Sequence, residues 1–452
     1  MRIPFEIWAS PEPTIARIDE STSRDQSRET GHDSRIGDLD LLASLGVTAT
    51  RYPVLWEKAS PESSDRVDLS WARARLERLR ELDIEPVVTL LHHGSGPTRT
   101  SLVDPAFPES FAHYAGTVAS AFPWIRRWTP INEPLTTARF STLYGLWYPN
   151  TRDDDAAFGA AIVNEVLGIL LAMEAIRERN PQAELVITED LQGFTARDAG
   201  VAAFVAHKRE RSFLSIELAM GRVRPGHALY AYLTQTCGVP PERLDRIVEH
   251  ASAPALIGWN YYPNSERALS SGPDGTVLNE PARTYAAITP RPLLRAAHER
   301  LGLPFGISEV HINAGASERI AWFEARVDDL RALARDGLPV TMLGAWAAFG
   351  MVDWDSLLTR FEGVSEDGAF TFAGPGGTPQ ETALADCIRG YAAAARHTLA
   401  RSGTRAFGDA SERGSLPAGR VDIERTLAST VSFAEEARTF VNSAPSKRMS
   451  AE

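Results

Sequence analysis

Acidic, amide and histidine side chains follow short apolar runs at several points along the chain. The run TPI leads into Asn132 and Glu133, the run GIS leads into Glu309, and PVVTLL leads into His92 and His93. A buried carboxyl group is costly unless it is paired, so these positions are unusual for a plain core. Two carboxyl groups that flank one cavity can cleave a glycosidic bond, because one donates a proton while the other attacks the sugar.

These side chains must be positioned by the elements around them. Short apolar, β-branched or aromatic runs alternate along the chain with longer stretches rich in Ala, Leu, Arg and Glu. Several runs are almost continuously apolar, which is typical of strands in a parallel sheet covered on both faces. The sequence predicts eight strands, at 3–9, 47–56, 86–93, 125–132, 184–190, 255–260, 304–310 and 340–348.

The stretches between these strands have helical periodicity. LSWARARLERLRELD and SERIAWFEARVDDLRALARDG both place apolar residues at i, i+3 and i+4. Eight strands that alternate with helices predict an α/β protein built as a (β/α)8 TIM barrel. A doubly wound sheet is the alternative, but no GxGxxG sequence follows a predicted strand. The candidate residues fall at the C-terminal ends of the predicted strands, where such barrels carry their functional groups.

The composition and charge of the chain disfavour nucleic acid and membranes as partners. The formal net charge of −12 disfavours nucleic acid, which is bound by clustered Lys and Arg. No run of about 18 or more apolar residues indicates a membrane span, and the N-terminus lacks the continuous apolar segment of a signal peptide. The two cysteines, Cys237 and Cys387, provide no disulfide framework. We therefore expect a cytoplasmic protein that binds neither nucleic acid nor membrane.

The chain is expected to divide into a barrel at 1–398 and a C-terminal segment at 399–452. The apolar periodicity weakens in this segment, which predicts a linker, a possible single helix and a disordered tail. Residues 191–254 are long for one barrel connection, so we expect them to form an insertion over the barrel mouth.

Six stretches together resemble glycoside hydrolase family 1, the retaining β-glycosidases with a (β/α)8 barrel. Their order and spacing carry the resemblance, which extends over roughly residues 1–395. The stretches are RYPVLWEKASPE (51–62), IEPVVTLLHHGSGP (84–97), TPINEP (129–134), IGWNYY (257–262), ISEV (307–310) and WAAFGMVDW (346–354).

This resemblance implies a role for each matching residue. Glu133 falls on the acid/base of the family and Glu309 on its nucleophile. Arg51 matches an arginine near the nucleophile, and Tyr262 matches a substrate-site tyrosine that hydrogen-bonds the nucleophile. The other matches are sugar-binding positions, namely His92, Asn132, Trp346, Asp353 and Trp354. A retaining mechanism implies carboxyl groups about 5–5.5 Å apart, and it requires no cofactor and no metal.

The sugar-binding shell departs from the family pattern. The chain has EVH (309–311) where the family has Glu-Asn-Gly, and LHH (91–93) where it has Tyr-His-Trp. Asp353 replaces a longer glutamate that holds two sugar hydroxyls, and Glu12 is a weak match to a glutamine on the first strand. Both catalytic glutamates remain, so these changes indicate an altered sugar preference rather than lost chemistry.

A narrower resemblance concerns GSGP, INEPLTTARFSTLYGLWYP and ITED. They resemble a divergent family 1 branch that is fused to a C-terminal domain related to dTDP-4-dehydrorhamnose reductases. We expect that domain to be absent, since nothing after residue 400 predicts a nucleotide-binding fold. The association favours a 6-deoxy sugar as the group that is cleaved off.

Two other functions stay open, and in each the partner is a small-molecule glycoside. The altered shell also suits a sugar-binding pseudoenzyme, and the carboxyl pair suits a transglycosidase that uses an acceptor other than water. A metal site at His92 and His93 is disfavoured, because adjacent strand residues point to opposite faces. Glu189 and Asp190, at the end of the fifth predicted strand, are expected to be solvated or hydrogen-bonded loop acids.

Overall fold

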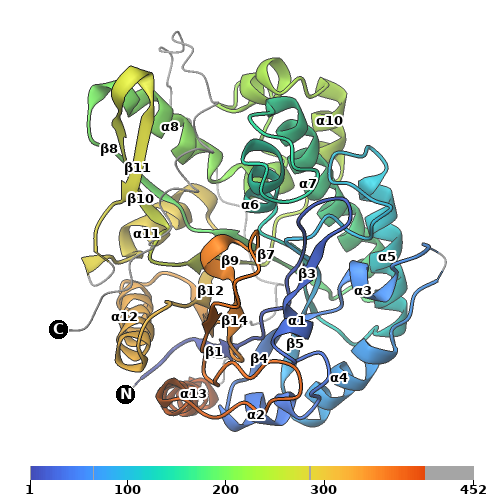
Figure 1. Ribbon diagram of the computed structural model, residues 1–452, viewed down its shortest axis with the longest axis vertical. Coiled ribbons are helices and arrows are strands. Elements are labelled where there is room, and N and C mark those ends of the chain that lie inside the picture. Colours follow the sequence, from blue (N-terminus) through green and yellow to red (C-terminus); the bar gives the residue numbers. More distant parts are fainter. Residues whose placement is uncertain (1, 65, 285–286, 403–452) are drawn as a thin grey trace.

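Eight parallel strands close into a barrel at the centre of the protein (Figure 1). The computed structural model describes residues 2–64, 66–284 and 287–402. Successive barrel strands are hydrogen-bonded neighbours and the last pairs with the first, which confirms the predicted (β/α)8 barrel. In chain order the strands are β1 (Glu6–Ala9), β4 (Ala49–Pro53), β5 (Glu85–His92), β6 (Arg127–Asn132), β7 (Glu184–Asp190), β9 (Leu256–Tyr261), β12 (Phe305–Val310) and β13 (Val340–Ala345).

The observed strands agree with the predicted ranges to within a few residues at each end. The fifth, predicted at 184–190, matches β7 in full. The second, predicted at 47–56, is shorter because Pro53 has no N–H group for the ladder and α3 (Trp56–Ala59) begins soon afterwards. The eighth, predicted to reach 348, ends at Ala345, where the chain enters a turn.

Helices cover the outside of the barrel. The longest, α7 (Asp155–Arg177), is apolar around most of its circumference because it packs on a neighbouring helix and on the barrel wall. Its length and mean hydropathy of 1.9 would suit a membrane crossing, but 78% of the window concerned is buried inside the protein. The other main helices of this layer are α2 (Asp38–Ser44), α4 (Ser70–Glu81), α5 (Phe107–Ala121), α11 (Arg291–Leu301), α12 (Ala316–Arg335) and α13 (Ala383–Ser402).

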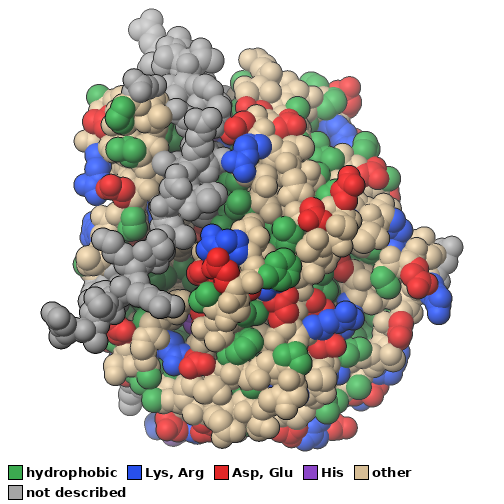
Figure 2. All heavy atoms as spheres, viewed as in Figure 1, with side chains coloured by type: hydrophobic (Ala, Val, Ile, Leu, Met, Phe, Trp, Pro, Cys, Tyr) green, Lys and Arg blue, Asp and Glu red, His purple; other side chains and the backbone are tan. Residues whose placement is uncertain are grey.

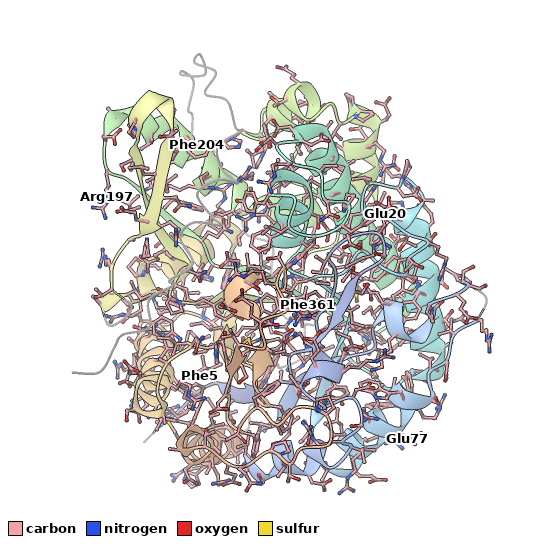
Figure 3. The ribbon with its side chains drawn as sticks, in the orientation of Figure 1. Phe5, Glu20, Glu77, Arg197, Phe204 and Phe361 are labelled. Carbon is pink, nitrogen blue, oxygen red and sulfur yellow. The ribbon has the colours of Figure 1, made fainter. Side chains whose placement is uncertain are left out.

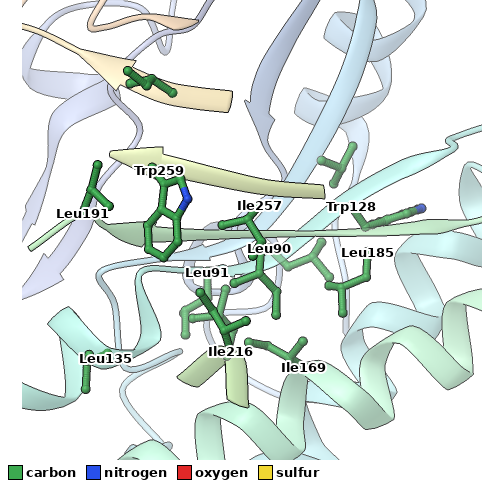
Figure 4. Close-up of a cluster of buried hydrophobic side chains, with 14 of the residues drawn as sticks. Leu90, Leu91, Trp128, Leu135, Ile169, Leu185, Leu191, Ile216, Ile257 and Trp259 are labelled. Carbon is green, nitrogen blue, oxygen red and sulfur yellow. The ribbon is translucent and has the colours of Figure 1, made fainter. Parts of the chain in front are cut away.

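Apolar side chains pack on both faces of the barrel wall. Trp8, Val87 and Met342 belong to a small buried cluster contributed by six of the barrel strands. On the other face, Leu90 of β5 lies in the large core that also includes Ile169 of α7 (Figure 4). Because β5 contributes apolar side chains to both faces of the barrel wall, its sequence is continuously apolar.

A small sheet forms outside the barrel. The predicted insertion at 191–254 contains β8 (Gly193–Ala196), α8 (Ala202–Arg211), α9 (Leu214–Ala219) and α10 (Pro241–Glu249). β8 pairs with β10 (Glu266–Ser271), and β10 pairs with β11 (Val277–Pro281), at the upper left of Figure 1. Arg197 and Phe204, which follow β8, mark this part of the molecule in Figure 3.

The predicted domain boundary at 398 falls inside α13, which continues to Ser402. The linker, single helix and tail predicted for the rest of the segment lie outside the described residues, which end at 402.

One strand carries a bulge immediately before a predicted catalytic residue. In β12, Ile307 pairs with Trp259 of β9, but the next pair joins Glu309 to Asn260. Ser308 is therefore an extra residue, and between Ile307 and Val310 β12 also has one residue more than the facing segment of β13. A bulge of this kind turns the side chain that follows it away from the plain strand alternation.

Two glycines on the flanking strands make room for this bulge. A Cβ atom on Gly258 of β9 would lie 2.8 Å from Ser308 Cβ. One on Gly344 of β13 would lie 2.3 Å from the Ser308 carbonyl oxygen. Glycine within a strand commonly marks such a close approach of backbones, so these two residues help to position Glu309.

We expect Gly344→Ala to lower the free energy of unfolding by about 1–3 kcal/mol, because the added methyl group meets the Ser308 backbone. Gly390→Ala is the matched control, since nothing lies within 4 Å of the same methyl group on α13, and Ala favours a helix over Gly. Denaturant unfolding measures both. Equal stability of the two variants would contradict the proposed packing of Gly344.

Candidate active site

Two glutamates meet at the C-terminal ends of the barrel strands. Glu133 directly follows β6, and Glu309 lies near the end of β12, three strands further round the ring. Both are buried, with 5% of Glu133 and 3% of Glu309 exposed. After burial, the charge of Glu309 is the largest influence on the pKa of Glu133. The side chain of Asn260 is hydrogen-bonded both to Glu133 and to Ser308, the residue before Glu309, so the structure brings together the two carboxyl groups that the sequence singled out.

A cation and a phenol hold Glu309. The guanidinium of Arg51 donates to Glu309 Oε1 at 2.5 Å, and the hydroxyl of Tyr262 donates to Oε2. Burial raises the pKa of Glu309, whereas Arg51 and the Tyr262 hydrogen bond oppose that rise. Burial and the charge of Glu309 raise the pKa of the Tyr262 hydroxyl well above its ordinary value, so it remains a donor.

The hydrogen-bond partner of Glu133 is a neutral amide. Asn260 Nδ2 donates to Glu133 Oε1 at 2.5 Å, and His93 Nε2 lies 3.9 Å from Oε2. Burial and the charge of Glu309 raise the pKa of Glu133 well above its ordinary value. Since Arg51 favours the ionised form of Glu309 and no cation contacts Glu133 among the described residues, Glu133 is the member of the pair that more strongly favours the protonated form.

Asn132, the last residue of β6, connects the surrounding groups. Its Oδ1 accepts from Arg51 at 2.5 Å and from Thr188 Oγ1 at 2.8 Å. Its Nδ2 lies 3.2 Å from the Nε2 atoms of both His92 and His93, so each of its two hydrogens faces one ring. Both ends of the amide are engaged, which fixes its orientation.

This arrangement requires both histidines to be neutral. Each Nε2 accepts a hydrogen from Asn132, so we assign the ring proton to Nδ1. His93 Nδ1 then donates to Thr137 Oγ1 at 3.1 Å, while His92 Nδ1 has no hydrogen-bond partner in the described part of the chain. Burial lowers the pKa of His92 well below its ordinary value, and that of His93 to about 3.

The prediction that these two histidines point to opposite faces is wrong. β5 ends at His92, and His93 adopts a left-handed backbone conformation with a φ of 58°. The strand alternation therefore stops between them, and both rings reach Asn132. The rings meet edge to face with centroids 4.8 Å apart.

The two predicted sugar-stacking tryptophans differ in accessibility. Trp346 is only 2% exposed, its ring is stacked on His92, and the Arg51 guanidinium lies 4.9 Å from the ring centroid. Trp346 Nε1 donates to Glu12 Oε2 at 3.0 Å, which places the weakly predicted Glu12 in the site. Trp354 is partly exposed and therefore offers the more accessible aromatic surface.

Asp353 is held in an ion pair. Its Oδ2 accepts from Arg24 at 2.9 Å, and its Oδ1 accepts from the backbone N–H of Val364 at 2.8 Å. Arg24 also pairs with Glu29 and lies 4.2 Å from the exposed ring of Phe361, near the centre of Figure 3. Acidic and basic side chains are interspersed over the same face of the molecule in Figure 2. Only the remaining lone pairs of Asp353 are free to bind a ligand.

Several contributors to the site had no role in the sequence prediction. Ser308 Oγ donates to Asn260 Oδ1 at 2.5 Å and thereby orients the Asn260 amide. His311 donates from Nδ1 to the Trp346 carbonyl oxygen at 3.0 Å, and its Nε2 lies 2.8 Å from Glu366. Asn260 stood at the end of a predicted strand, which was a usable signal. Ser308 reaches the site through the bulge, which strand alternation does not predict.

We expect Arg51→Met to lower the free energy of unfolding by about 3–5 kcal/mol, because it leaves Glu309 buried without its cation. In a Glu309→Gln background the same substitution leaves no uncompensated charge, so its cost should be clearly smaller. Denaturant unfolding of the wild type, both single variants and the double variant measures the difference. Equal costs in both backgrounds would show that Arg51 does not stabilise the Glu309 carboxylate.

Part of the chain is similar in sequence to one known family. The family model for Glycosyl hydrolase family 1 matches residues 11–224, which include Glu133 and end before Glu309. Beta-glucosidase A of Thermotoga maritima is 29% identical over 149 residues, 31% of this chain and 33% of that protein. Klotho of Homo sapiens is 32% identical over 125 residues, 25% of this chain and 12% of that protein. The matched segments thus span about a third or less of these relatives.

Solved structures share the fold over most of the chain. A beta-glucosidase from Thermotoga maritima in complex with glucoimidazole has a TM-score of 0.72 at 17% identity, covering 87% of this chain and 98% of that one. The AHE enzyme from Alicyclobacillus herbarius has a TM-score of 0.72 at 20% identity, covering 88% and 99%. The sequence of residues 11–224 is thus similar to glycosyl hydrolase family 1, while the solved structures show the shared (β/α)8 fold.

Proposed function

We propose that this protein is a retaining glycosidase that hydrolyses a β-linked sugar, with Glu309 as nucleophile and Glu133 as acid/base. The observation that carries this proposal is the contrast between two neighbouring buried carboxyl groups. Glu309 accepts a hydrogen bond from the Arg51 cation, whereas Glu133 accepts one from the neutral Asn260 amide. One ionised and one protonated carboxyl group are what a double-displacement reaction requires at its start.

In the first step, a carboxylate oxygen of Glu309 forms a bond to the anomeric carbon. The bond from that carbon to the leaving oxygen breaks, and Glu133 transfers its proton to that oxygen. Arg51 and Tyr262 hold the attacking carboxylate in place. Asn132 would meet the sugar 2-hydroxyl, which replaces one of its bonds to His92 and His93.

In the second step, water replaces Glu309 on the sugar. Once Glu309 is esterified it carries no charge, so its contribution to the raised pKa of Glu133 disappears. Glu133, which gave up its proton in the first step, therefore stays ionised and accepts a proton from the attacking water. As that proton is removed, the water oxygen attacks the anomeric carbon, the bond to Glu309 breaks, and the sugar leaves with its original configuration.

We propose a 6-deoxy sugar as the group that is cleaved off. Asp353 is shorter than the family glutamate, and Arg24 and Val364 already occupy its oxygens. A sugar with one hydroxyl fewer needs fewer acceptors at that end of the site. A panel of aryl β-glucoside, β-galactoside and β-fucoside tests this, and a clear preference for either hexoside that carries the 6-hydroxyl would overturn it.

We expect Glu309→Gln to reduce kcat for an aryl β-glycoside by several orders of magnitude, because an amide cannot form the glycosyl-enzyme. Glu133→Ala should lose about 10²–10⁴-fold on a substrate with a poor leaving group. Added azide should rescue the slow second step of Glu133→Ala and yield a β-glycosyl azide. Hydrolysis rates on wild type and both variants measure these effects, and full activity of Glu309→Gln would exclude the mechanism.

The same assays separate the alternatives. Wild-type protein that binds sugars saturably but cleaves no member of the panel would support a sugar-binding pseudoenzyme. A product that carries an added alcohol in place of water would identify a transglycosidase.

The pH–rate profile of the wild type should be bell-shaped, and Asp190→Asn should move both limbs to lower pH. The Asp190 charge raises the pKa of both Glu133 and Glu309, so its removal lets each carboxyl group ionise at lower pH. Measurement of kcat/KM between about pH 4 and 9 checks this. Asp198→Asn removes a charge at an exposed position and should leave the profile in place. An unchanged Asp190→Asn profile would contradict the electrostatic role of Asp190.

A further inference from the structure

We infer that Glu189 positions Glu133 by capping the helix that follows it, which leaves the Glu133 carboxyl group free for the reaction. Glu189 is the penultimate residue of β7, the strand beside β6 in the barrel. It does not touch the reacting atoms and is therefore a positioning residue. This role rests on the proposed function, in which Glu133 is the acid/base.

The chain makes an abrupt transition at Glu133. β6 ends at Asn132, and α6 (Pro134–Ala138) begins one residue after Glu133. Glu133 is the N-cap of this helix and adopts a left-handed conformation with a φ of 45° and a ψ of 60°. A residue other than glycine holds such a conformation only where its surroundings enforce it, at a cost of about 1–3 kcal/mol.

The hydrogen bonds of the backbone N–H groups around Glu133 show which residues hold its left-handed conformation. Glu133 N donates to the carbonyl oxygen of Thr188 on β7 at 3.1 Å. Pro134 has no N–H group, which suits the first position of a helix. Leu135 N donates to Glu189 Oε2 at 3.0 Å, and Thr137 N donates to the carbonyl oxygen of Glu133 at 2.9 Å.

The side chain of an N-cap residue usually accepts the first-turn hydrogen bond. Glu133 makes no such bond, because its carboxyl group is turned into the site toward Asn260. Glu189 supplies the missing acceptor from the neighbouring strand. The capping function and the catalytic carboxyl group are thus divided between two residues.

Glu189 is built to hold this position. Its side chain is fully buried, and four donors surround its two oxygens. Ser215 Oγ donates to Oε2 at 2.8 Å, while Thr136 Oγ1 and Asp190 N donate to Oε1 at 3.3 and 3.2 Å. Glu189 therefore joins β7, α6 and α9 at a single point behind Glu133.

The test compares two aryl β-glycosides that differ in their need for an acid. A 2,4-dinitrophenyl group leaves without a proton, whereas a phenyl group needs the proton of Glu133. We expect Glu189→Ala to lose about 10–100-fold more kcat/KM on the phenyl glycoside than on the dinitrophenyl glycoside, a part of what an acid contributes. Glu189→Gln keeps one acceptor and should lie between Glu189→Ala and the wild type.

Glu165→Ala is the matched control. Glu165 lies on α7, is fully buried like Glu189, and its carboxyl oxygens make no hydrogen bond within the described residues. It should reduce stability but keep the wild-type ratio between the two substrates. Equal losses on both substrates for the Glu189 variants would overturn the inference.

A second measurement separates this inference from the proposed function. If the wild type cleaves neither substrate, the proposed function is wrong, and a crystal structure of Glu189→Gln or Glu189→Ala still tests the positioning. Loss of the left-handed conformation of Glu133, or of its hydrogen bond to Asn260, would support the capping role. An unchanged Glu133 in both variants would overturn it.

Discussion

The burial of charge at the mouth of the barrel is the constraint on which the rest of the site depends. Glu12, Glu133 and Glu309 are all withdrawn from water, and burial raises the pKa of each, that of Glu12 to about 7. Arg51 is the cation that contacts this group, through Glu309, Asn132 and the ring of Trp346. A charge acts strongly on its neighbours in such a medium, so the side on which Arg51 lies determines which glutamate ionises.

The backbone meets this constraint by departing from regular strand geometry where the barrel strands end. His93 and Glu133 each adopt a left-handed conformation directly after a barrel strand, and Ser308 is the extra residue of a bulge. Each departure turns a side chain toward a hydrogen-bond partner that a regular strand would not reach. The cost of these conformations is offset by buried hydrogen bonds that would otherwise be unmade.

Much of the fold could be predicted from the sequence because its signals are periodic. Continuous apolar strands between amphipathic helices indicated the barrel, and the acids at the strand ends indicated Glu133 and Glu309. The partners of these residues were harder to predict. The contacts of Asn260 depend on the bulge at Ser308, and the contacts of His93 depend on a backbone turn that strand alternation does not describe.

The hydrogen bond between Leu135 and Glu189 is a further contact that the sequence pattern does not predict. Glu189 stood at the end of a predicted strand and could be recognised only as a hydrogen-bonded loop acid. Its role depends on the pairing of β6 with β7, which places an acid of one strand behind the helix that follows the other. A cap supplied by a neighbouring strand leaves no local pattern of the kind that an N-cap residue leaves in its own helix.

Asp353 and His311, which differ from the family pattern, also make hydrogen bonds to other segments of the barrel protein. Asp353 holds Arg24 and the backbone of Val364, while His311 joins the carbonyl oxygen of Trp346 to Glu366. A substitution at this end must therefore preserve hydrogen bonds and an ion pair that link distant segments of the chain. The pair of Glu133 and Glu309 depends instead on Arg51, Tyr262 and Asn260, none of which contacts Asp353 through a hydrogen bond in the described structure. The hydrogen bonds of Asp353 are separate from those of Glu133 and Glu309, so the residues around Asp353 can diverge while the carboxyl pair keeps its geometry.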